Sequence, residues 1–254
     1  MAGAHDSVRI REALLADDAV IDAIAREGDA GADGEYLALV RSQRGLLLVA
    51  DSDGVVVAYG GVIPVEPPMD ALMLTDLFVT TSARGRGIGG QLLTALFGDN
   101  QRRMTSSSKH DAALPAYQRA GMMPRQRILY FVGHGSGLAG AALPANEPWR
   151  HERAGLVDAW SRCGGHVGPD VATVVEDGGV RIARLQSAGP VAVLHDTLRS
   201  IDSAITVRLC VPERSPVASA VVALGFEVED NDIWCASPGV DLPDDLHVLD
   251  PGLG

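Results

Sequence analysis

Short apolar runs alternate with amphipathic segments along the first half of the chain, and the two patterns predict strands and helices. Apolar residues at every third or fourth position indicate a helix that buries one face, whereas compact apolar runs bounded by turn residues indicate strands. The pattern predicts strands at residues 8–10, 45–50, 55–65, 72–79, 103–107 and 128–132, and helices at 14–26, 36–41, 89–97 and 112–119. Asp53-Gly54 predicts a hairpin turn between the second and third strands. These elements predict a mixed α/β fold.

The second half repeats the order of elements of the first. Residues 133–148 are rich in Gly, Ala and Pro and are typical of a linker. Beyond them the pattern predicts helices at 154–163, 197–203 and 216–224, and strands at 171–176, 180–185, 205–211 and 226–236, with residues 191–194 leading into the second helix. The order strand–helix–strand–helix–strand occurs in both halves, so we expect an internal duplication. The expected division is a domain at 1–133, a linker at 134–150 and a second domain at 151–254.

Composition indicates an ordinary soluble protein, because 46% of the 254 residues are apolar and 21% are charged. No apolar run is long enough for a membrane span, and the first residues lack the basic and apolar regions of a signal peptide. We therefore expect a cytoplasmic protein. Cys163, Cys210 and Cys235 are odd in number and far apart, which suits a reducing compartment and gives no metal-ligand spacing.

The charge is distributed unevenly between the halves. A net charge of −12 argues against a general nucleic-acid-binding protein, whose affinity depends on a basic surface. Residues 1–135 contain 13 of the 21 basic and 16 of the 33 acidic residues, so their net charge is −3, which leaves −9 for residues 136–254. A strongly acidic second half favours a cationic small partner.

The stretch RGRGIGG, at residues 84–90, is the segment that points to a particular kind of ligand. Gly85, Gly87 and Gly90 satisfy the G-x-G-x-x-G pattern of a dinucleotide-binding turn. That turn follows directly after an early strand of a parallel βαβ unit, with an acidic residue about 20 positions later at a strand end. Here five residues separate Val79 from Gly85, and several hairpin-linked strands come first. The context therefore argues against a dinucleotide.

The same stretch suits a pyrophosphate. Glycines let the backbone approach an anion closely, the N–H groups of the following helix point at it, and two arginines add positive charge without a metal. The stretch matches [Q/R]-x-x-G-x-[G/A] and resembles the coenzyme A loop of the GNAT acyltransferase superfamily. The resemblance implies that acetyl-CoA is bound by Arg84, Gly85, Arg86, Gly87, Ile88, Gly89 and Gly90. The alternative is a glycine-rich turn before an ordinary helix.

The resemblance extends over residues 8–132. LTDLFVTTSARGRGIGGQLL resembles the family's fourth strand, loop and third helix, and KHDAALPAYQRAGMMP resembles a segment that is commonly N-x-A-A-x-x-x-Y-x-x-x-G-F. Tyr117 and Gly121 match that segment, whereas His110 replaces its asparagine and Met122 its phenylalanine. The resemblance implies an α/β (α+β) GNAT fold with a central mixed, mostly antiparallel sheet, and the repeated order implies two tandem GNAT-like domains.

The resemblance also implies roles for individual residues. The fourth strand splays from the fifth in this family, so the backbone groups of Leu77, Phe78 and Val79 would pair with the pantetheine arm. Tyr117 matches the tyrosine that protonates the leaving thiolate in many members, and its alternative role is packing in a half-buried helix. His110 would contact the cofactor or cap the following helix, a role that Asp111 could also fill.

Acidic residues near the fourth strand are candidates for orienting or deprotonating an amine. Asp76 is the favoured one, and its alternative role is that of a polar residue on an exposed strand face. Glu66 and Asp70 flank the preceding turn and are weaker candidates. In the second half, GPVAVLHDTLRS stands where the loop would fall and contains no cluster of glycines. We therefore expect the second half to bind no cofactor.

These observations predict an N-acetyltransferase that moves an acetyl group from acetyl-CoA to a primary amine of a small molecule or peptide by direct attack, without a metal. We expect a cationic amine, and neither a nucleic acid nor a membrane as partner. The oligomeric state stays open, a homodimer included. The alternative from another class is a non-catalytic acyl-CoA-binding sensor or regulatory module, and a dinucleotide-dependent oxidoreductase ranks third.

Overall fold

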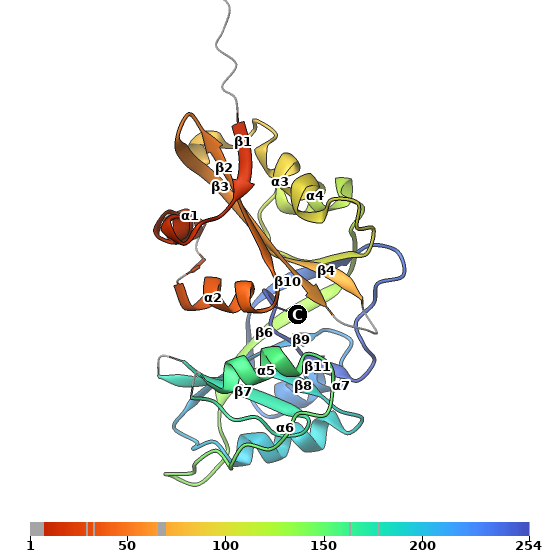
Figure 1. The fold of residues 1–254 in the computed structure, drawn as a ribbon. Helices are drawn as coiled ribbons and strands as arrows, with labels where there is room; N and C mark the ends of the chain where they lie inside the picture. The colour runs from red at the N-terminus through yellow and green to blue at the C-terminus, as the bar shows by residue number, and fades with distance from the viewer. Residues whose placement is uncertain are drawn as a thin grey trace, which may run out of the picture.

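The computed structural model describes residues 8–28, 30–32, 34–65, 70–162, 164–176 and 178–253 (Figure 1). The strands are β1 (Val8–Glu12), β2 (Leu46–Ser52), β3 (Val55–Val65), β4 (Ala71–Val79), β5 (Arg103–Ser107), β6 (Met123–His134), β7 (Val171–Glu176), β8 (Gly179–Gln186), β9 (Thr206–Pro212), β10 (Glu227–Ala236) and β11 (Leu246–Val248). The helices are α1 (Asp18–Glu27), α2 (Gly34–Ser42), α3 (Ile88–Phe97), α4 (Ala113–Arg119), α5 (Ala154–Ser161), α6 (Pro190–Arg199) and α7 (Pro216–Ala223).

One sheet runs through both halves of the molecule. Its order is β1-β2-β3-β4-β5-β10-β6-β9-β8-β11, and β7 pairs with β8. The pairs β4–β5 and β8–β9 are parallel, and the other pairs among the described strands are antiparallel. The predicted α/β fold with a mixed, mostly antiparallel sheet is confirmed.

The parallel pair β4–β5 is short. Its register ends where Leu74 lies beside Thr105, whereas on its other side β5 pairs with β10 from Met104 to Ser107. An irregularity at the same point on the β3 side skips Thr75, and a Cβ on the facing Gly61 would lie 2.6 Å from Thr75 Oγ1, so glycine is needed there. Among the described strands, none pairs with residues 75–79 on the side that faces β5. We call this side the open edge of β4.

The two halves exchange strands at the centre of the sheet. β10 comes from the second half and lies between β5 and β6, while β6 comes from the first half and lies between β10 and β9. Figure 1 shows β10 and β6 crossing the middle of the molecule, where the halves meet. Each half therefore completes its part of the sheet with a strand of the other.

In the second half the parallel strands β8 and β9 diverge as β4 and β5 do in the first, but another segment of the chain fills the space between them. The pairing of β8 with β9 ends at Ile182 and Leu209, next to an irregularity in the β7–β8 register. β11 then pairs with β8 at Leu185 and Gln186, and the Leu249 N–H donates to a β9 carbonyl at 3.1 Å. The edge of β8 that corresponds to the open edge of β4 is thus occupied by the chain itself.

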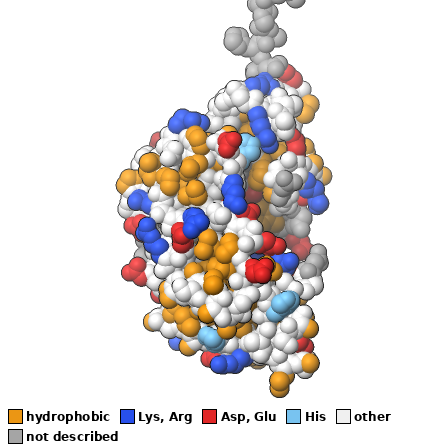
Figure 2. All heavy atoms as spheres, turned by 180° about the vertical axis from the view of Figure 1, so that it is seen from behind, with side chains coloured by type: hydrophobic (Ala, Val, Ile, Leu, Met, Phe, Trp, Pro, Cys, Tyr) orange, Lys and Arg blue, Asp and Glu red, His pale blue; other side chains and the backbone are white. Residues whose placement is uncertain are grey.

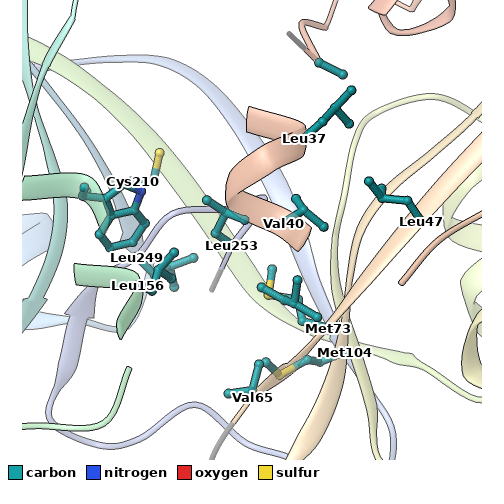
Figure 3. Packing of buried hydrophobic residues seen from close by; sticks show 14 of the residues in the cluster. Leu37, Val40, Leu47, Val65, Met73, Met104, Leu156, Cys210, Leu249 and Leu253 are labelled. Carbon is teal, nitrogen blue, oxygen red and sulfur yellow. The ribbon is translucent and has the colours of Figure 1, made fainter. Parts of the chain in front are cut away.

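Helices cover both faces of the sheet. One hydrophobic cluster joins α3 and α4 to Leu74 and Cys235, and another joins α1, α2 and α5 to Met73 and Trp234. Since neighbouring residues of a strand point to opposite faces, these clusters lie on opposite sides of the sheet. Figure 3 shows Leu253 and Leu249, from the end of the chain, packed between Val40 of α2 and Cys210 of β9. The halves therefore share a core.

The structure corrects some of the expected elements. Residues 191–194 were expected to precede a helix at 197–203, but α6 begins at Pro190 and ends at Arg199. Proline is well accommodated at the first helical position, because the N–H that it lacks has no partner there. β6 extends on both sides of the expected 128–132, and β11 was not expected. Glu66 and Cys163 lie outside the described residues.

Candidate active site

The glycine-rich loop opens α3 in a conformation that needs glycine. Gly85 and Gly87 have φ values of 77° and 78°, which L-residues rarely adopt. Gly87 is the N-cap of the helix, and the Gln91 N–H donates to its carbonyl at 3.1 Å. The N–H groups of the first helical turn, which starts at Ile88, precede this bond and have no acceptor within the helix. They form the donor cluster that an anion requires.

The loop also leaves room for a ligand. A Cβ added at Gly85, Gly87 or Gly90 would meet nothing within 4 Å, which is the open cradle that a pyrophosphate would fill. Gly89 faces the open edge of β4, since a Cβ there would lie 3.7 Å from a side-chain carbon of Val79. A cavity of about 260 Å³ continues from Gly90 between α3 and α4. The loop therefore borders the open edge at Gly89 and this cavity at Gly90.

Arg84 connects the loop to its surroundings. Its Nε donates to the Val79 carbonyl at 3.0 Å, and its Nη1 lies 3.4 Å from Nε2 of His110. The other ring nitrogen of His110 accepts from the Ala112 N–H at 3.2 Å, so this histidine, not Asp111, supports the start of α4. Arg86 is exposed. The contacts of Arg84, Arg86 and His110 with a cofactor remain predictions.

Asp76 lies on the α1–α2 side of the sheet, between two tyrosines. The Tyr36 hydroxyl donates to its Oδ2 at 2.6 Å, and the Tyr59 hydroxyl lies 3.4 Å from its Oδ1. Burial raises the pKa of the Asp76 carboxyl group, and the hydrogen bonds from Tyr36, Thr75 and Tyr59 oppose that rise. Asp76 is half-buried, so it is not a solvated residue of an exposed strand face.

Tyr117 lies on the other side of the sheet, in the cluster that includes α3. It is 7% exposed, and no described residue forms a hydrogen bond with its hydroxyl group. Burial raises the pKa of Tyr117, and the nearby Asp76, Cys235 and Asp232 raise it further. The hydroxyl therefore stays protonated at neutral pH.

The open edge of β4 connects these two sides. Leu77 and Val79 pack against the cluster of α3 and α4, whereas Phe78 stacks on Tyr59 on the opposite face with ring centroids 5.5 Å apart. On the β3 side, the backbones of Leu77, Phe78 and Val79 are paired with β3. Their β5 side has no strand partner. The backbone along this edge is therefore open to an extended ligand arm.

Several site residues were not found from the sequence. Tyr36 and Tyr59 come from α2 and β3, and their hydroxyl groups meet Asp76 only in the folded chain. Asp232 lies on β10, where the Tyr130 hydroxyl donates to its Oδ2 at 2.7 Å. An acidic residue in the apolar strand DIWCA was a signal, but its place beside β5 depends on the strand exchange. Asp70, a weaker candidate, is exposed at the opposite end of β4 from the loop.

One face of the molecule has a hollow lined by hydrophobic side chains (Figure 2). On the face drawn in Figure 2, hydrophobic side chains line a hollow, with Lys or Arg beside it and acidic side chains near its lower end. No group of three or more His, Cys, Asp or Glu residues in the described parts of the chain has metal-binding geometry. Within those parts, no helix is long and apolar enough to cross a membrane.

The chain is similar to known acetyltransferases in sequence and in fold. The family profile described as Acetyltransferase (GNAT) domain matches residues 43–121, whereas no curated protein sequence matches the chain. A Pyrococcus horikoshii protein described as a candidate acetyltransferase has a TM-score of 0.73 at 12% identity, with 100% of both chains covered. A GCN5-related N-acetyltransferase from Sphaerobacter thermophilus has a TM-score of 0.55 at 14% identity, covering 92% of this chain and 98% of its own.

These comparisons agree with the geometry. At such identities the two structures establish the fold, and the family profile establishes the domain. The profile spans the open edge of β4, the glycine-rich loop and Tyr117. Residues 43–121 therefore match a GNAT acetyltransferase domain, and acetyl-CoA is the acyl donor of GNAT acetyltransferases.

Proposed function

We propose that this protein transfers the acetyl group of acetyl-CoA to a primary amine of a small molecule or peptide by direct attack in a ternary complex. The observation that carries the proposal is the position of the open edge of β4, which leads from the glycine-rich loop to Asp76 on one face and Tyr117 on the other. Acetyl-CoA supplies an activated thioester, whose acyl carbon accepts the amine nitrogen while the carbon–sulfur bond breaks.

The loop and the open edge would bind the donor. N–H groups at the start of α3 hold the pyrophosphate, with Arg84 and Arg86 adding positive charge. The backbone groups of Leu77, Phe78 and Val79 extend the sheet onto the pantetheine arm, as an added strand would. An N–H of this edge also stabilises the negative charge that develops on the thioester oxygen.

Asp76 and Tyr117 would handle the protons. Asp76 accepts a proton from the cationic amine, directly or through a water molecule, and a carboxyl group whose pKa is raised by burial is better suited to hold it. Tyr117 donates a proton to the departing sulfur, since its hydroxyl is protonated and has no described hydrogen-bond partner. The cationic amine loses two protons in total. Asp76 takes the first, which gives the neutral nucleophile, and the second leaves the nitrogen as the amide forms and replaces the proton that Tyr117 gives to the thiolate. One proton is thus released to solvent in each turnover, by way of Asp76.

We further propose that the second half is a degenerate GNAT-like unit without a cofactor site. Gly189 and Pro190 open α6, and proline removes one of the N–H groups that an anion would need. β11 occupies the edge of β8 that would take the pantetheine arm. The domain division at 133–134 and 150–151 stays part of this proposal. The second half contributes β10 to the acceptor side instead.

A panel of amines with acetyl-CoA, followed by detection of free thiol, tests the proposal. We expect thiol release that depends on the amine, and an acetylated product whose mass is increased by one acetyl group. Binding of CoA without thiol release for any amine in a broad panel would favour the non-catalytic sensor. Binding of NADH without binding of CoA would overturn the proposal altogether.

A further inference from the structure

Asp232 comes from the second half of the chain but lies beside the acetyltransferase site of the first. β10 pairs with β5, with Trp234 directly opposite Ser106. Directly opposite residues of neighbouring strands share a face, and residues two positions apart on a strand share it too. Asp232 thus lies on the same face as Trp234, which packs in the cluster of α1 and α2. This is the face on which Asp76 meets Tyr36.

The environment of Asp232 parallels that of Asp76. Both residues are half-buried, and each accepts a hydrogen bond from a tyrosine, Tyr130 at 2.7 Å for Asp232 and Tyr36 at 2.6 Å for Asp76. Burial raises the pKa of both carboxyl groups. Lys109 lowers the pKa of Asp232 and Asp230 raises it, but Lys109 itself is paired with the exposed Asp230. Asp232 therefore keeps an oxygen that a ligand can use.

Both carboxylates lie close to the proposed reaction centre. The negative charges of Asp76 and Asp232 each raise the pKa of Tyr117. Asp76 is on β4 and Asp232 on β10, and β5 lies between these strands. An amine that reaches the open edge of β4 from the α1–α2 side therefore meets two carboxylates, one from each half of the chain.

A buried N–H without a partner lies on the same strand and face as Asp232. The indole N–H of Trp234 is buried and forms no hydrogen bond with any described residue, and Trp234 is 1% exposed. The Ser106 hydroxyl, directly opposite Trp234, lowers the pKa of Asp232. Because buried polar groups in native proteins are nearly always paired, the Trp234 N–H indicates that a polar ligand or water completes this place.

We propose that Asp232 is a specificity-determining residue that binds a second cationic group of the acceptor, while Asp76 serves the amine that is acetylated. The proposal rests on the acetyltransferase function proposed above. The acceptor class is a compact diamine, or an amine with another positive charge a few bonds away. The acidic second half thus acts through one placed carboxylate, which the strand exchange brings to the site.

A matched pair of amines tests the proposal. The probes are 1,4-diaminobutane and 1-aminobutane, which differ in the second amino group. With Asp232→Asn we expect KM for 1,4-diaminobutane to rise by about tenfold or more, with kcat within about twofold and no change for 1-aminobutane. Glu229→Gln removes an equal charge from an exposed position on the same strand and should change neither amine. An equal effect of Asp232→Asn on both amines, or a fall in kcat alone, would overturn the proposal.

A binding experiment separates this proposal from the proposed function. Calorimetry of 1,4-diaminobutane with the CoA-loaded protein does not depend on turnover. Binding by the wild-type protein that is weakened about tenfold in Asp232→Asn supports the site even if no amine is acetylated, a result that would sink only the catalytic function. No difference between wild type and variant refutes the site. Tyr130→Phe keeps the charge of Asp232 but removes its hydrogen bond, so a smaller loss is expected there.

Discussion

Gly87→Asp should weaken CoA binding by about 30-fold without unfolding the protein. Gly87 is the N-cap of α3, its φ is 78°, and a Cβ added there meets nothing within 4 Å. The substituted chain has room for the side chain, so its stability falls only by the cost of a left-handed backbone, about 1–2 kcal/mol. The new carboxylate lies where the first N–H groups of α3 would hold the pyrophosphate.

The size of the effect follows from Coulomb's law. Two unit charges 4 Å apart repel by about 1 kcal/mol in water and by about 4 kcal/mol at an effective dielectric constant of 20. The loop is exposed at Gly85, Arg86 and Gly87, so the aqueous value applies more nearly. Repulsion from the two charges of a pyrophosphate then amounts to about 2 kcal/mol, a loss of affinity of about 30-fold, since 1.4 kcal/mol is tenfold.

Calorimetric titration with CoA measures this loss, and a second glycine provides the control. Gly178 has a φ of 71° with nothing within 4 Å of a built Cβ, and it lies in the β7–β8 turn of the second half. Gly178→Asp should lower the melting temperature similarly and leave CoA binding unchanged. A dissociation constant for Gly87→Asp within about threefold of the wild-type value would refute the pyrophosphate site at this loop.

Four further predictions concern catalysis and stability. Tyr117→Phe should lower kcat by about 10²–10⁴ with unchanged CoA affinity, and an unchanged kcat would reduce Tyr117 to packing. Asp76→Asn should lower kcat yet raise the melting temperature at pH 8. Burial raises the folded-state pKa of Asp76, so the ionised carboxylate destabilises the wild-type protein fully above that pKa. This destabilisation vanishes as pH falls below the pKa of the unfolded state, where the melting temperatures of wild type and variant should converge. Gly165→Ala should lower the free energy of unfolding, measured by chemical denaturation, by about 3 kcal/mol, because the new Cβ would lie 1.8 Å from the Thr173 carbonyl oxygen. The control is Gly155→Ala in α5, where the new Cβ would lie in open space and the free energy of unfolding should not fall. The KM for a cationic amine should rise with ionic strength while kcat stays level, and a KM indifferent to salt would argue against electrostatic steering.

The features that depend on local chemistry were predictable from the sequence. The glycine spacing predicts a loop that leaves the start of the following helix open to an anion. Such a loop needs positive φ values, which Gly85 and Gly87 have. The boundaries of α3 lie within a residue of the expected ones, because Leu92 and Leu96 mark its buried face at helical spacing. Both features are decided within about ten residues of the chain.

The features that depend on distant pairing were not predictable in this way. Asp232 was a candidate for no role, because nothing in its own segment indicates that β10 lies between β5 and β6. Tyr36 is 40 residues from Asp76, and their hydrogen bond depends on how α2 crosses the sheet. β11 is three residues long and resembles a loop in sequence. Strand order is a tertiary property, so period and propensity carry little information about it.

In each half of the chain, two parallel strands diverge from one another. What lies between the diverging strands explains why we propose one donor site although the halves share an element order. Backbone groups along residues 75–79 of β4 face a space without a strand, whereas the matching edge of β8 is paired with β11 at Leu185 and Gln186. A strand added to an edge satisfies the same backbone groups that a pantetheine arm would use, so β11 and a bound cofactor exclude each other. Pro190 removes a donor from the start of α6 as well. On the proposed function, the second half therefore lacks both requirements for a cofactor, and its contribution to the chemistry would be β10, which carries Asp232 toward the first site.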